Sequence, residues 1–505
     1  MFEIAVVHFI QRVFSALPVV ALAALLGACA HSPPPDPGGP KSWVVENVAS
    51  KSTAELYADV IKPGVFERSS SKVIDGYTVE SGNLRMPDKS EGSLVTVRSA
   101  DGSLTALVER TGMRGLLVIN KKGEKTFNPD RASGSLRNDV EVNTTEERKL
   151  SASGSQAKSP MVVDILIGYS RAAVVSVGGD ATSHALALVE SANLALRNSL
   201  VASVSLSLVG VQVIERNYPI NSSQVRNIQS IFSEGMRALK PDMLYAIFSG
   251  HPDDDAAGRG QMPGRFAVGY PEAFIFRHEI GHNAGGLHCP SEPGALVRYG
   301  HGYNNGKSNT AQCGEEGVYY STPAVIDQFG LPKGNAFTAD MARVWRENAR
   351  RLSSYALPFT GERISLISIG ESSEVHLELN MPARYQAGIV ALDSAEGPTD
   401  LAPAPRGYTR LAVKLRNASG DEREVYLRAE RSIGECEWFA MNAYAACPFS
   451  GSTASKIYFK LTFNAADNPT LPNSIYNGGL KLEARNLVGS WRSPVTVLVS
   501  VAGSH

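Results

Sequence analysis

Cysteine is scarce in this chain, and neither sign of charge is in excess. The 505 residues include five cysteines, and 49 basic side chains are balanced by 50 acidic ones, which leaves a formal charge of −1. A balanced chain has no general field that would attract nucleic acid, so no nucleic-acid partner is expected. Hydrophobic residues make up 43% and charged residues 20%, as in an ordinary soluble globular protein, and the length predicts two to four domains.

Long hydrophobic runs are also lacking, apart from residues 13–26, which are too few to span a membrane comfortably. This run follows Arg12 and ends in Leu-Gly-Ala-Cys, which resembles a bacterial lipobox. We therefore expect residues 1–28 to be a signal peptide, Cys29 to carry lipid, and the Pro/Gly-rich residues 29–40 to be a tether. The expected location is the bacterial outer membrane or cell surface, with the membrane as a partner; an ordinary cleaved signal peptide and secretion is the alternative.

With Cys29 assigned to lipid, four cysteines remain. An exported address makes disulfides reasonable, and proximity in sequence favours the pairs Cys289–Cys313 and Cys436–Cys447. The alternative is unpaired buried thiols.

The motif that carries most information is H-E-x-x-H-x-x-G-x-x-H at residues 278–288. Because residues four apart lie one turn apart on a helix, His278 and His282 can point at one metal ion. Gly285 permits the positive φ with which a helix ends, after which His288 can return as a third ligand. Three neutral imidazoles leave a fourth position for water, which is typical of catalytic zinc rather than structural zinc.

Glu279 lies one residue beyond the first histidine, where it can face the metal without binding it. The spacing therefore predicts one catalytic Zn²⁺ held by His278, His282 and His288, with Glu279 as general base. The preceding Pro271-Glu272 predicts the start of the helix. His301 is either a supporting group or a loop histidine.

At these residues the chain resembles the metzincins, and the Gly-His-Asn form of the motif is similar to the reprolysin-like branch and its bacterial peptidyl-Asp-type relatives. The resemblance covers about residues 161–357. It extends to segments that look like the first strand, the first helix and the stretches after the third histidine of that family: residues 164–169, 192–199, 300–303 and 319–323. It implies a zinc peptidase fold and activity.

Two positions depart from the family pattern. The family carries a methionine turn beneath the zinc, but no Met occurs between His288 and Met341, and residues 310–313 (Thr-Ala-Gln-Cys) stand in the equivalent place. Cys289 follows the third histidine where the family often has Asp. No cysteine lies between Cys29 and Cys289 to silence the zinc as a thiolate, so latency would come from a carboxylate, from steric cover or from nothing.

The pattern of elements predicts a multidomain α+β protein. Residues 41–135 indicate a β-rich propeptide or a permanent accessory domain, 136–160 a linker, 161–357 the metzincin-type α/β catalytic domain, and 358–505 an immunoglobulin-like β-sandwich. Within the catalytic region, helices are predicted at residues 224–239 and 338–355, the latter capped by Thr338. Residues 265–268 are predicted as the edge strand along which an extended peptide or protein substrate binds.

The expected function is that of an exported zinc endopeptidase. The alternative is a catalytically weakened surface protein of the same fold that binds a ligand through its C-terminal β-sandwich. Hydrolysis of cell-wall peptides also stays open, because nothing in the sequence fixes the substrate pocket.

Overall fold

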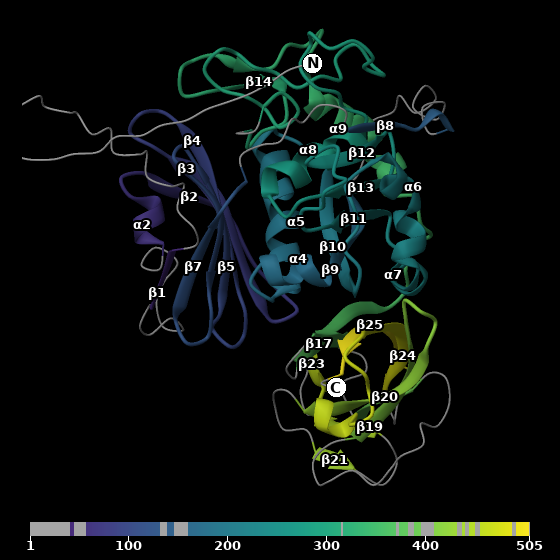
Figure 1. Ribbon diagram of the computed structural model, residues 1–505. Coiled ribbons are helices and arrows are strands. Elements are labelled where there is room, and N and C mark those ends of the chain that lie inside the picture. Colours follow the sequence, from purple (N-terminus) through teal and green to yellow (C-terminus); the bar gives the residue numbers. More distant parts are fainter. Residues whose placement is uncertain are drawn as a thin grey trace, which may run out of the picture. The chain divides into compact units, whose positions relative to one another are not determined.

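The structure is a computed structural model of the whole chain (Figure 1). It describes residues 41–44, 57–131, 139–145, 160–314, 317–369, 373–381, 388–394, 409–431, 437–439, 444–449, 455–486 and 491–503. The predicted signal peptide, the tether, Cys29 and Cys436 lie outside these ranges.

The first part of the chain is an antiparallel sheet of seven strands in the order β1-β7-β6-β5-β4-β3-β2, so that most neighbours in the sheet are neighbours in sequence. The sequence predicted β structure here, and it is confirmed. The elements are β1 (Lys41–Val44), α2 (Ala58–Ile61), β2 (Val65–Ile74), β3 (Tyr77–Arg85), β4 (Glu91–Arg98), β5 (Leu104–Arg110), β6 (Met113–Ile119) and β7 (Glu124–Pro129).

The second part is a mixed sheet of six strands in the order β10-β9-β11-β13-β12-β8, in which β12 alone runs antiparallel to its neighbour β13. Its strands are β8 (Val140–Val142), β9 (Met161–Ser170), β10 (Val204–Ile214), β11 (Met243–Ile247), β12 (Gly258–Met262) and β13 (Phe266–Gly269). Its helices are α4 (Arg171–Ser176), α5 (Ala181–Asn198), α6 (Ser222–Ile231), α7 (Ser233–Leu239), α8 (Ala273–Ala284) and α9 (Met341–Leu352), and the small hairpin β14 (Thr322–Ile326) and β15 (Pro332–Lys333) precedes α9.

Both faces of this sheet are buried. Side chains alternate along each strand, so neighbouring residues point into two different hydrophobic cores. On β9, Ile165 and Ile167 face the core formed with α5, α8 and α9. Leu166, between them, faces the core formed with α6 and α7. Helices lie on both sides of the sheet, with α4 and α5 on one side and α6 and α7 on the other (Figure 1). Parallel strands covered on both faces read as continuous hydrophobic runs, and all five residues of β11 are buried.

Capping residues and hydrophobic spacing predicted some helix ends correctly and others wrongly. Asp180 caps α5 by accepting from the Ser183 amide at 2.9 Å, as polar caps do. The helix predicted over 224–239 is two helices, because the chain turns at Phe232, whose ring is fully buried. The predicted cap Thr338 is wrong: α9 begins after Asp340, whose carboxylate accepts from the Arg343 amide at 3.0 Å.

The predicted edge strand is also wrong. Residues 265–268 fall largely in β13, which lies inside the sheet between β11 and β12. The strand beyond it is β12, and its outer side pairs with β8 over three residues. The sequence predicted a linker over 136–160, but Val140–Val142 is a strand of the central sheet.

The β structure predicted for the C-terminal part is confirmed, but where the sequence predicted an immunoglobulin-like sandwich the described strands form one ten-stranded sheet that curves almost into a barrel (Figure 1). Only the first and last of its strands pair in parallel with one another. The strands are β16 (Glu362–Ser368), β17 (Ser373–Met381), β18 (Gly388–Ser394), β19 (Thr409–Asn417), β20 (Glu422–Arg431), β21 (Glu437–Phe439), β22 (Tyr444–Phe449), β23 (Ser455–Phe463), β24 (Ile475–Asn486) and β25 (Arg492–Ala502), with a short 3₁₀ helix at Ala465–Asp467.

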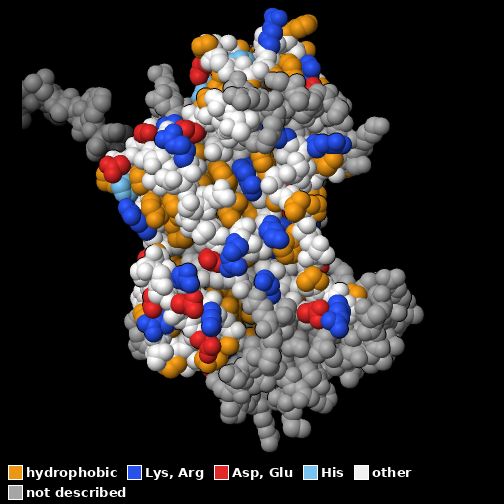
Figure 2. All heavy atoms as spheres, turned by 90° about the vertical axis from the view of Figure 1, so that its right-hand side faces the viewer, with side chains coloured by type: hydrophobic (Ala, Val, Ile, Leu, Met, Phe, Trp, Pro, Cys, Tyr) orange, Lys and Arg blue, Asp and Glu red, His pale blue; other side chains and the backbone are white. Residues whose placement is uncertain are grey.

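The N-terminal sheet shares a hydrophobic core with the central part. Val79, Val95 and Leu107 of the first sheet belong to the same buried cluster as Leu186 and Leu194 of α5. No helix in the described ranges is both long and apolar enough to cross a membrane. On the face drawn in Figure 2, basic and acidic side chains are interspersed with hydrophobic and uncharged ones.

Candidate metal centre

Helix α8 carries the first half of the motif. It begins after Glu272, as predicted, and ends at Gly285, whose φ of +114° is the left-handed conformation that glycine adopts without strain. His278 and His282 lie one turn apart on its buried face. After the turn at Gly285, His288 comes back toward them.

The structure brings the three predicted ligands together. The ring centroids of His278, His282 and His288 are 4.6, 5.1 and 5.0 Å apart in pairs. All three rings are buried. The ligand atoms of these histidines and of Asp139 all lie within 4.8 Å of one another, and they form a group that could hold a metal ion.

Each ring uses its Nδ1 to bond to a fixed oxygen. The acceptors are the Ala311 carbonyl for His278 at 2.8 Å, the Gly286 carbonyl for His282 at 2.7 Å, and Glu292 Oε2 for His288 at 2.7 Å. The other ring nitrogen, Nε2, is the atom that each of the three histidines turns toward Asp139. Such partners orient metal-binding histidines and raise their basicity.

Asp139 is the member of this group that sequence reasoning missed. Its carboxylate is fully buried and lies 3.1 Å from His278 Nε2, 2.9 Å from His288 Nε2 and 3.7 Å from His282 Nε2. Ligands of a tetrahedral zinc ion with bonds of 2.0–2.1 Å are separated by about 3.3 Å. Asp139 thus belongs with the three histidines to the group that could hold a metal ion, with a carboxylate oxygen about as far from His278 and His288 as two such ligands are from each other.

The charges of the site suit a cation. Burial acts to raise the pKa of Asp139, but the hydrogen bonds from the histidines outweigh it and hold the pKa well below its usual range. Burial lowers the pKa of His282 to about 4, whereas Asp139 and Glu292 outweigh burial at His288 and raise its pKa to about 9. His282 Nε2 has no hydrogen-bond partner within the described ranges. An ionised carboxylate and three imidazoles are a donor set that zinc accepts.

Glu279 lies in the narrow space between α8 and β12. A Cβ atom at Gly258 would be 2.4 Å from Glu279 Oε1, and one at Gly260 would be 3.2 Å from Oε2, so two glycines make room for the carboxylate. Neither carboxylate oxygen has a hydrogen-bond partner among the described residues. Burial, and then the charge of Asp139, raise the pKa of Glu279 well above its usual range. A buried carboxyl group with free oxygens is suited to moving a proton.

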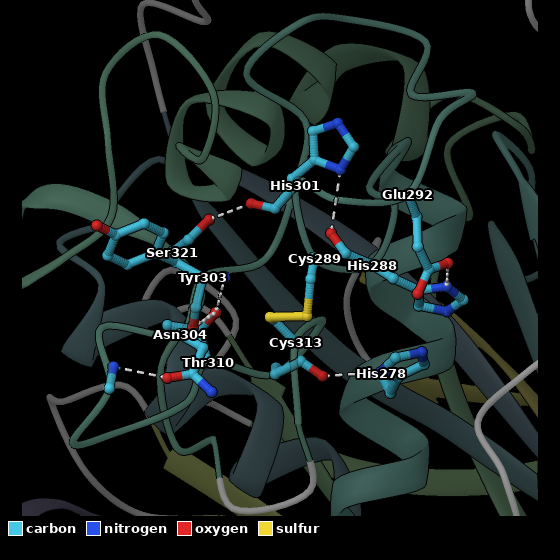
Figure 3. Close-up of a disulfide and its surroundings, with 12 residues drawn as sticks. His278, His288, Cys289, Glu292, His301, Tyr303, Asn304, Thr310, Cys313 and Ser321 are labelled. Carbon is cyan, nitrogen blue, oxygen red and sulfur yellow. Dashed lines mark hydrogen bonds and ion pairs between the residues drawn. A yellow bond between two sulfur atoms is a disulfide. The ribbon is translucent and has the colours of Figure 1, made fainter.

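The segment after His288 is joined to the floor of the site by a disulfide. Cys289 and Cys313 are bonded, with their Cα atoms 4.7 Å apart, as the sequence predicts (Figure 3). Next to it, Gln312 is buried against Gly281 of α8 and donates to the His278 carbonyl. Gln312 thus packs against the helix directly behind His278. The thioether of Met341 lies against Gly286.

His301 is buried and supports the site rather than facing solvent. Its Nδ1 lies 3.1 Å from the His288 carbonyl, and Figure 3 shows this contact beside the disulfide. The predicted Cys436–Cys447 pair cannot be placed, because Cys436 lies outside the described residues and the side chain of Cys447 is not described.

Comparison with known proteins does not assign a family. No family model and no curated protein sequence matches the chain. Among solved structures, the chain is similar to a chaperone-substrate complex (20% identity, 52% of this chain, 40% of that chain, TM-score 0.34). It is also similar to a chaperone-tip adhesin complex of CFA/I fimbriae (15% identity, 27% of this chain, 51% of that chain, TM-score 0.20). A third similar structure is the CFA/I enterotoxigenic E. coli adhesin CfaE (13% identity, 27% of this chain, 42% of that chain, TM-score 0.19). The matches span about half or less of each neighbour and are too weak to support an argument about fold or function.

Proposed function

We propose that this chain is an exported zinc-dependent endopeptidase of the metzincin type. One observation carries the proposal: three histidines form a group that could hold a metal ion, and Glu279, on the helix that carries two of them, has a buried carboxyl group without a hydrogen-bond partner in the described ranges. A structural zinc site needs four ligands but no free base. A hydrolytic site needs a base, and Glu279 supplies it.

In this proposal one set of residues holds the metal ion and another transfers the proton. His278, His282 and His288 would hold the ion, and Ala311, Gly286 and Glu292 fix their rings. Zinc in such a site supplies Lewis-acid activation of a water molecule and of the scissile carbonyl. A carboxylate oxygen of Glu279 accepts the proton of the attacking water and then donates it to the leaving amine.

The outer side of β12 would bind the substrate as an added strand. The Gly260 amide and the Met262 carbonyl point away from β13 and bond to the Asp139 carbonyl and the Asn143 amide, and a substrate strand would take over these two bonds. A peptide bound there lies alongside the helix that carries His278 and Glu279, since β12 and α8 pack directly together. Extended stretches of protein are therefore the substrates that we propose.

The location of the protein outside the cytosol is proposed from the sequence and from the disulfide. Disulfides persist in oxidising compartments outside the cytosol, so the Cys289–Cys313 bond supports export. Attachment to the outer membrane or cell surface through lipid on Cys29 is the specific proposal, with secretion as its alternative. We propose that residues 161–357 are the peptidase and that the C-terminal region, as an immunoglobulin-like module, binds or spaces.

Asp139 favours a second candidate function. A fourth protein ligand closes the site, as in structural zinc centres. In that case the metal would only stabilise the fold, and the C-terminal sheet would bind a surface ligand.

Digestion of casein and of a peptide library decides between the two. The purified chain and its Asp139→Ala variant are assayed with zinc, with a chelator, and in the Glu279→Gln background. For an endopeptidase, Glu279→Gln lowers turnover by about 10²–10⁴-fold and leaves one zinc per chain. Bound zinc without cleavage in any background supports the structural site, and cleavage unaffected by Glu279→Gln contradicts the peptidase.

A further inference from the structure

Tyr245 of β11 is a fully buried tyrosine that packs against the helix carrying two of the candidate ligands. Its ring meets that of Phe276 on α8 edge-on, with the ring centroids 4.8 Å apart. The Tyr245 hydroxyl has no hydrogen-bond partner among the described residues, although buried tyrosine hydroxyls usually find one. The fold therefore places an unsatisfied donor on the side of the sheet that α8 covers.

The two carboxyl oxygens of Glu279 face different neighbours. Oε2 lies on the side of Gly260, where an added Cβ atom would be 3.2 Å from this oxygen and 3.2 Å from the Cβ atom of His282. Oε1 lies on the side of Gly258, where an added Cβ atom would be 2.4 Å from this oxygen and 2.6 Å from Ile275 Cγ2. One oxygen of Glu279 is thus beside a candidate metal ligand, and the other is turned toward the preceding turn of α8.

A pair of glycines brings the Tyr245 hydroxyl close to Glu279 Oε1. Gly258 of β12 lies opposite Gly269 of β13 in their antiparallel ladder. An added Cβ atom at Gly269 would be 2.2 Å from the Tyr245 hydroxyl oxygen. The Cβ positions of directly opposite residues lie about 4.5–5.5 Å apart on one face of a sheet. The hydroxyl and Oε1 therefore lie above two neighbouring positions of the sheet, both of which lack a side chain.

The charges near Tyr245 favour Glu279 as the acceptor of its hydroxyl. Burial, then the charge of Glu279 and after it that of Glu272, raise the pKa of Tyr245 well above its usual range, so the hydroxyl keeps its proton. Glu272 lies two turns before Glu279, and it is the other carboxyl group near the hydroxyl. One oxygen of Glu272 already lies 3.4 Å from the Arg131 amide, whereas both oxygens of Glu279 lack a partner in the described part of the chain.

We infer that Tyr245 is a positioning residue for Glu279, and that its hydroxyl donates to Oε1 through one ordered water molecule. The inference rests on the proposed peptidase function and adds a residue to it. Ordered waters commonly satisfy buried polar groups that the protein leaves without a partner. With Oε1 held, Oε2 stays turned toward His282 and accepts the proton of the attacking water. Without the hydroxyl, the carboxyl group rotates and the base loses its alignment.

The first test measures the contact without measuring cleavage. Urea denaturation of the full chain, at one fixed zinc concentration, gives the unfolding constants of Tyr245→Phe, Glu279→Ala and the double variant. Tyr245→Phe should raise the unfolding constant of the wild type about tenfold, because a buried hydrogen bond is lost. In the Glu279→Ala background the same substitution should have little effect, because the acceptor is already missing.

Two matched variants show whether the effect belongs to this pair. Tyr169→Phe removes a buried hydroxyl from the neighbouring strand β9, but that hydroxyl has its own partner, His184 Nδ1, at 2.8 Å. Its effect should be equal in the wild-type and Glu279→Ala backgrounds. In a Glu272→Ala background, Tyr245→Phe should keep its full effect. An equal effect of Tyr245→Phe in every background would overturn the inference, and so would a loss of its effect only with Glu272→Ala.

Cleavage kinetics separate this inference from the proposed function. In the digests described above, Tyr245→Phe should lower kcat about 10–100-fold, leave KM within about twofold, and keep one zinc per chain. A tyrosine with only a structural role would leave kcat per folded, zinc-loaded chain unchanged, and that result would overturn the positioning role. If not even the wild type cleaves, the peptidase is refuted, and the unfolding constants still decide whether Tyr245 and Glu279 are joined.

Discussion

The two edges of the central sheet are covered in different ways. At the β10 edge, side chains of the C-terminal sheet cap the strand: Ser365 Oγ accepts from the Val211 amide at 2.9 Å, and Ser500 Oγ accepts from the Val213 amide at 3.3 Å. At the β12 edge, β8 continues the backbone ladder. A side-chain cap ends a sheet permanently, whereas an added strand can be exchanged for another strand.

The ion pairs that attach the N-terminal and the C-terminal sheet to the central part differ in how deeply they are buried. Arg277 and Glu109 are almost fully buried, with side-chain exposures of 1% and 7%. Arg363 and Asp164, near β10, are 15% and 24% exposed and lie 2.6 Å apart. Of these two pairs, the one at the N-terminal attachment is therefore the more costly to leave with one partner missing.

The largest expected effect comes from breaking the buried pair. Glu109→Ala leaves the Arg277 charge buried without its partner and should lower the free energy of unfolding by about 3–5 kcal/mol. Urea denaturation followed by tryptophan fluorescence measures it. Asp164→Ala, the matched change at the other attachment, should cost about 1 kcal/mol or less.

Replacing both partners sharpens this result. The double variant Glu109→Leu with Arg277→Met should recover most of the stability, because no unpaired charge remains. Equal losses for Glu109→Ala and Asp164→Ala would remove the distinction between the two attachments.

A smaller effect is expected at the ligand support. Glu292→Ala removes the acceptor that fixes His288 and should weaken zinc binding about 10–100-fold. Competition with a chromophoric chelator measures the affinity. Glu292→Gln keeps an acceptor oxygen and should lose less; unchanged affinity in the alanine variant would show that His288 is oriented by the backbone alone.

The side-chain caps at β10 should matter less again. Ser365→Ala leaves the Val211 amide without its acceptor and should cost about 1 kcal/mol in urea denaturation. Zinc content should stay at its wild-type value, because this edge does not reach the metal. A change in zinc content would mean that the two edges are coupled.

The smallest effect is a pH dependence of the N-terminal attachment. Burial acts to raise the pKa of Glu190, but Lys72 and Arg197 outweigh it and hold the pKa below the usual 4.5. The stabilisation is therefore fully present above pH ~4.5, the unfolded value, and is lost as the pH falls through the lower folded value. Glu190→Gln should flatten the decline of urea stability on the acid side only; a parallel decline in both proteins would contradict this role.

Much of the metal centre could be predicted from spacing. His278 and His282 are four residues apart, and Gly285 adopts the positive φ that ends α8. The helix cap at Thr338 failed because Asp340 competes for the same role two residues later. The prediction of the edge strand was wrong because residues 258–262, with their two glycines, have too little hydrophobic pattern to be recognised as a strand.

By itself the sequence determined the helix, its two histidines, the neighbouring glutamate and the third histidine after the turn at Gly285, because helix geometry relates residues that are a few positions apart. Only the tertiary structure decided what fills the fourth position. Asp139 is 139 residues from His278 in sequence, and it arrives through pairing between β8 and β12. Strand pairing depends on which edge groups are left unbonded after the whole sheet has formed, and no local pattern contains that information.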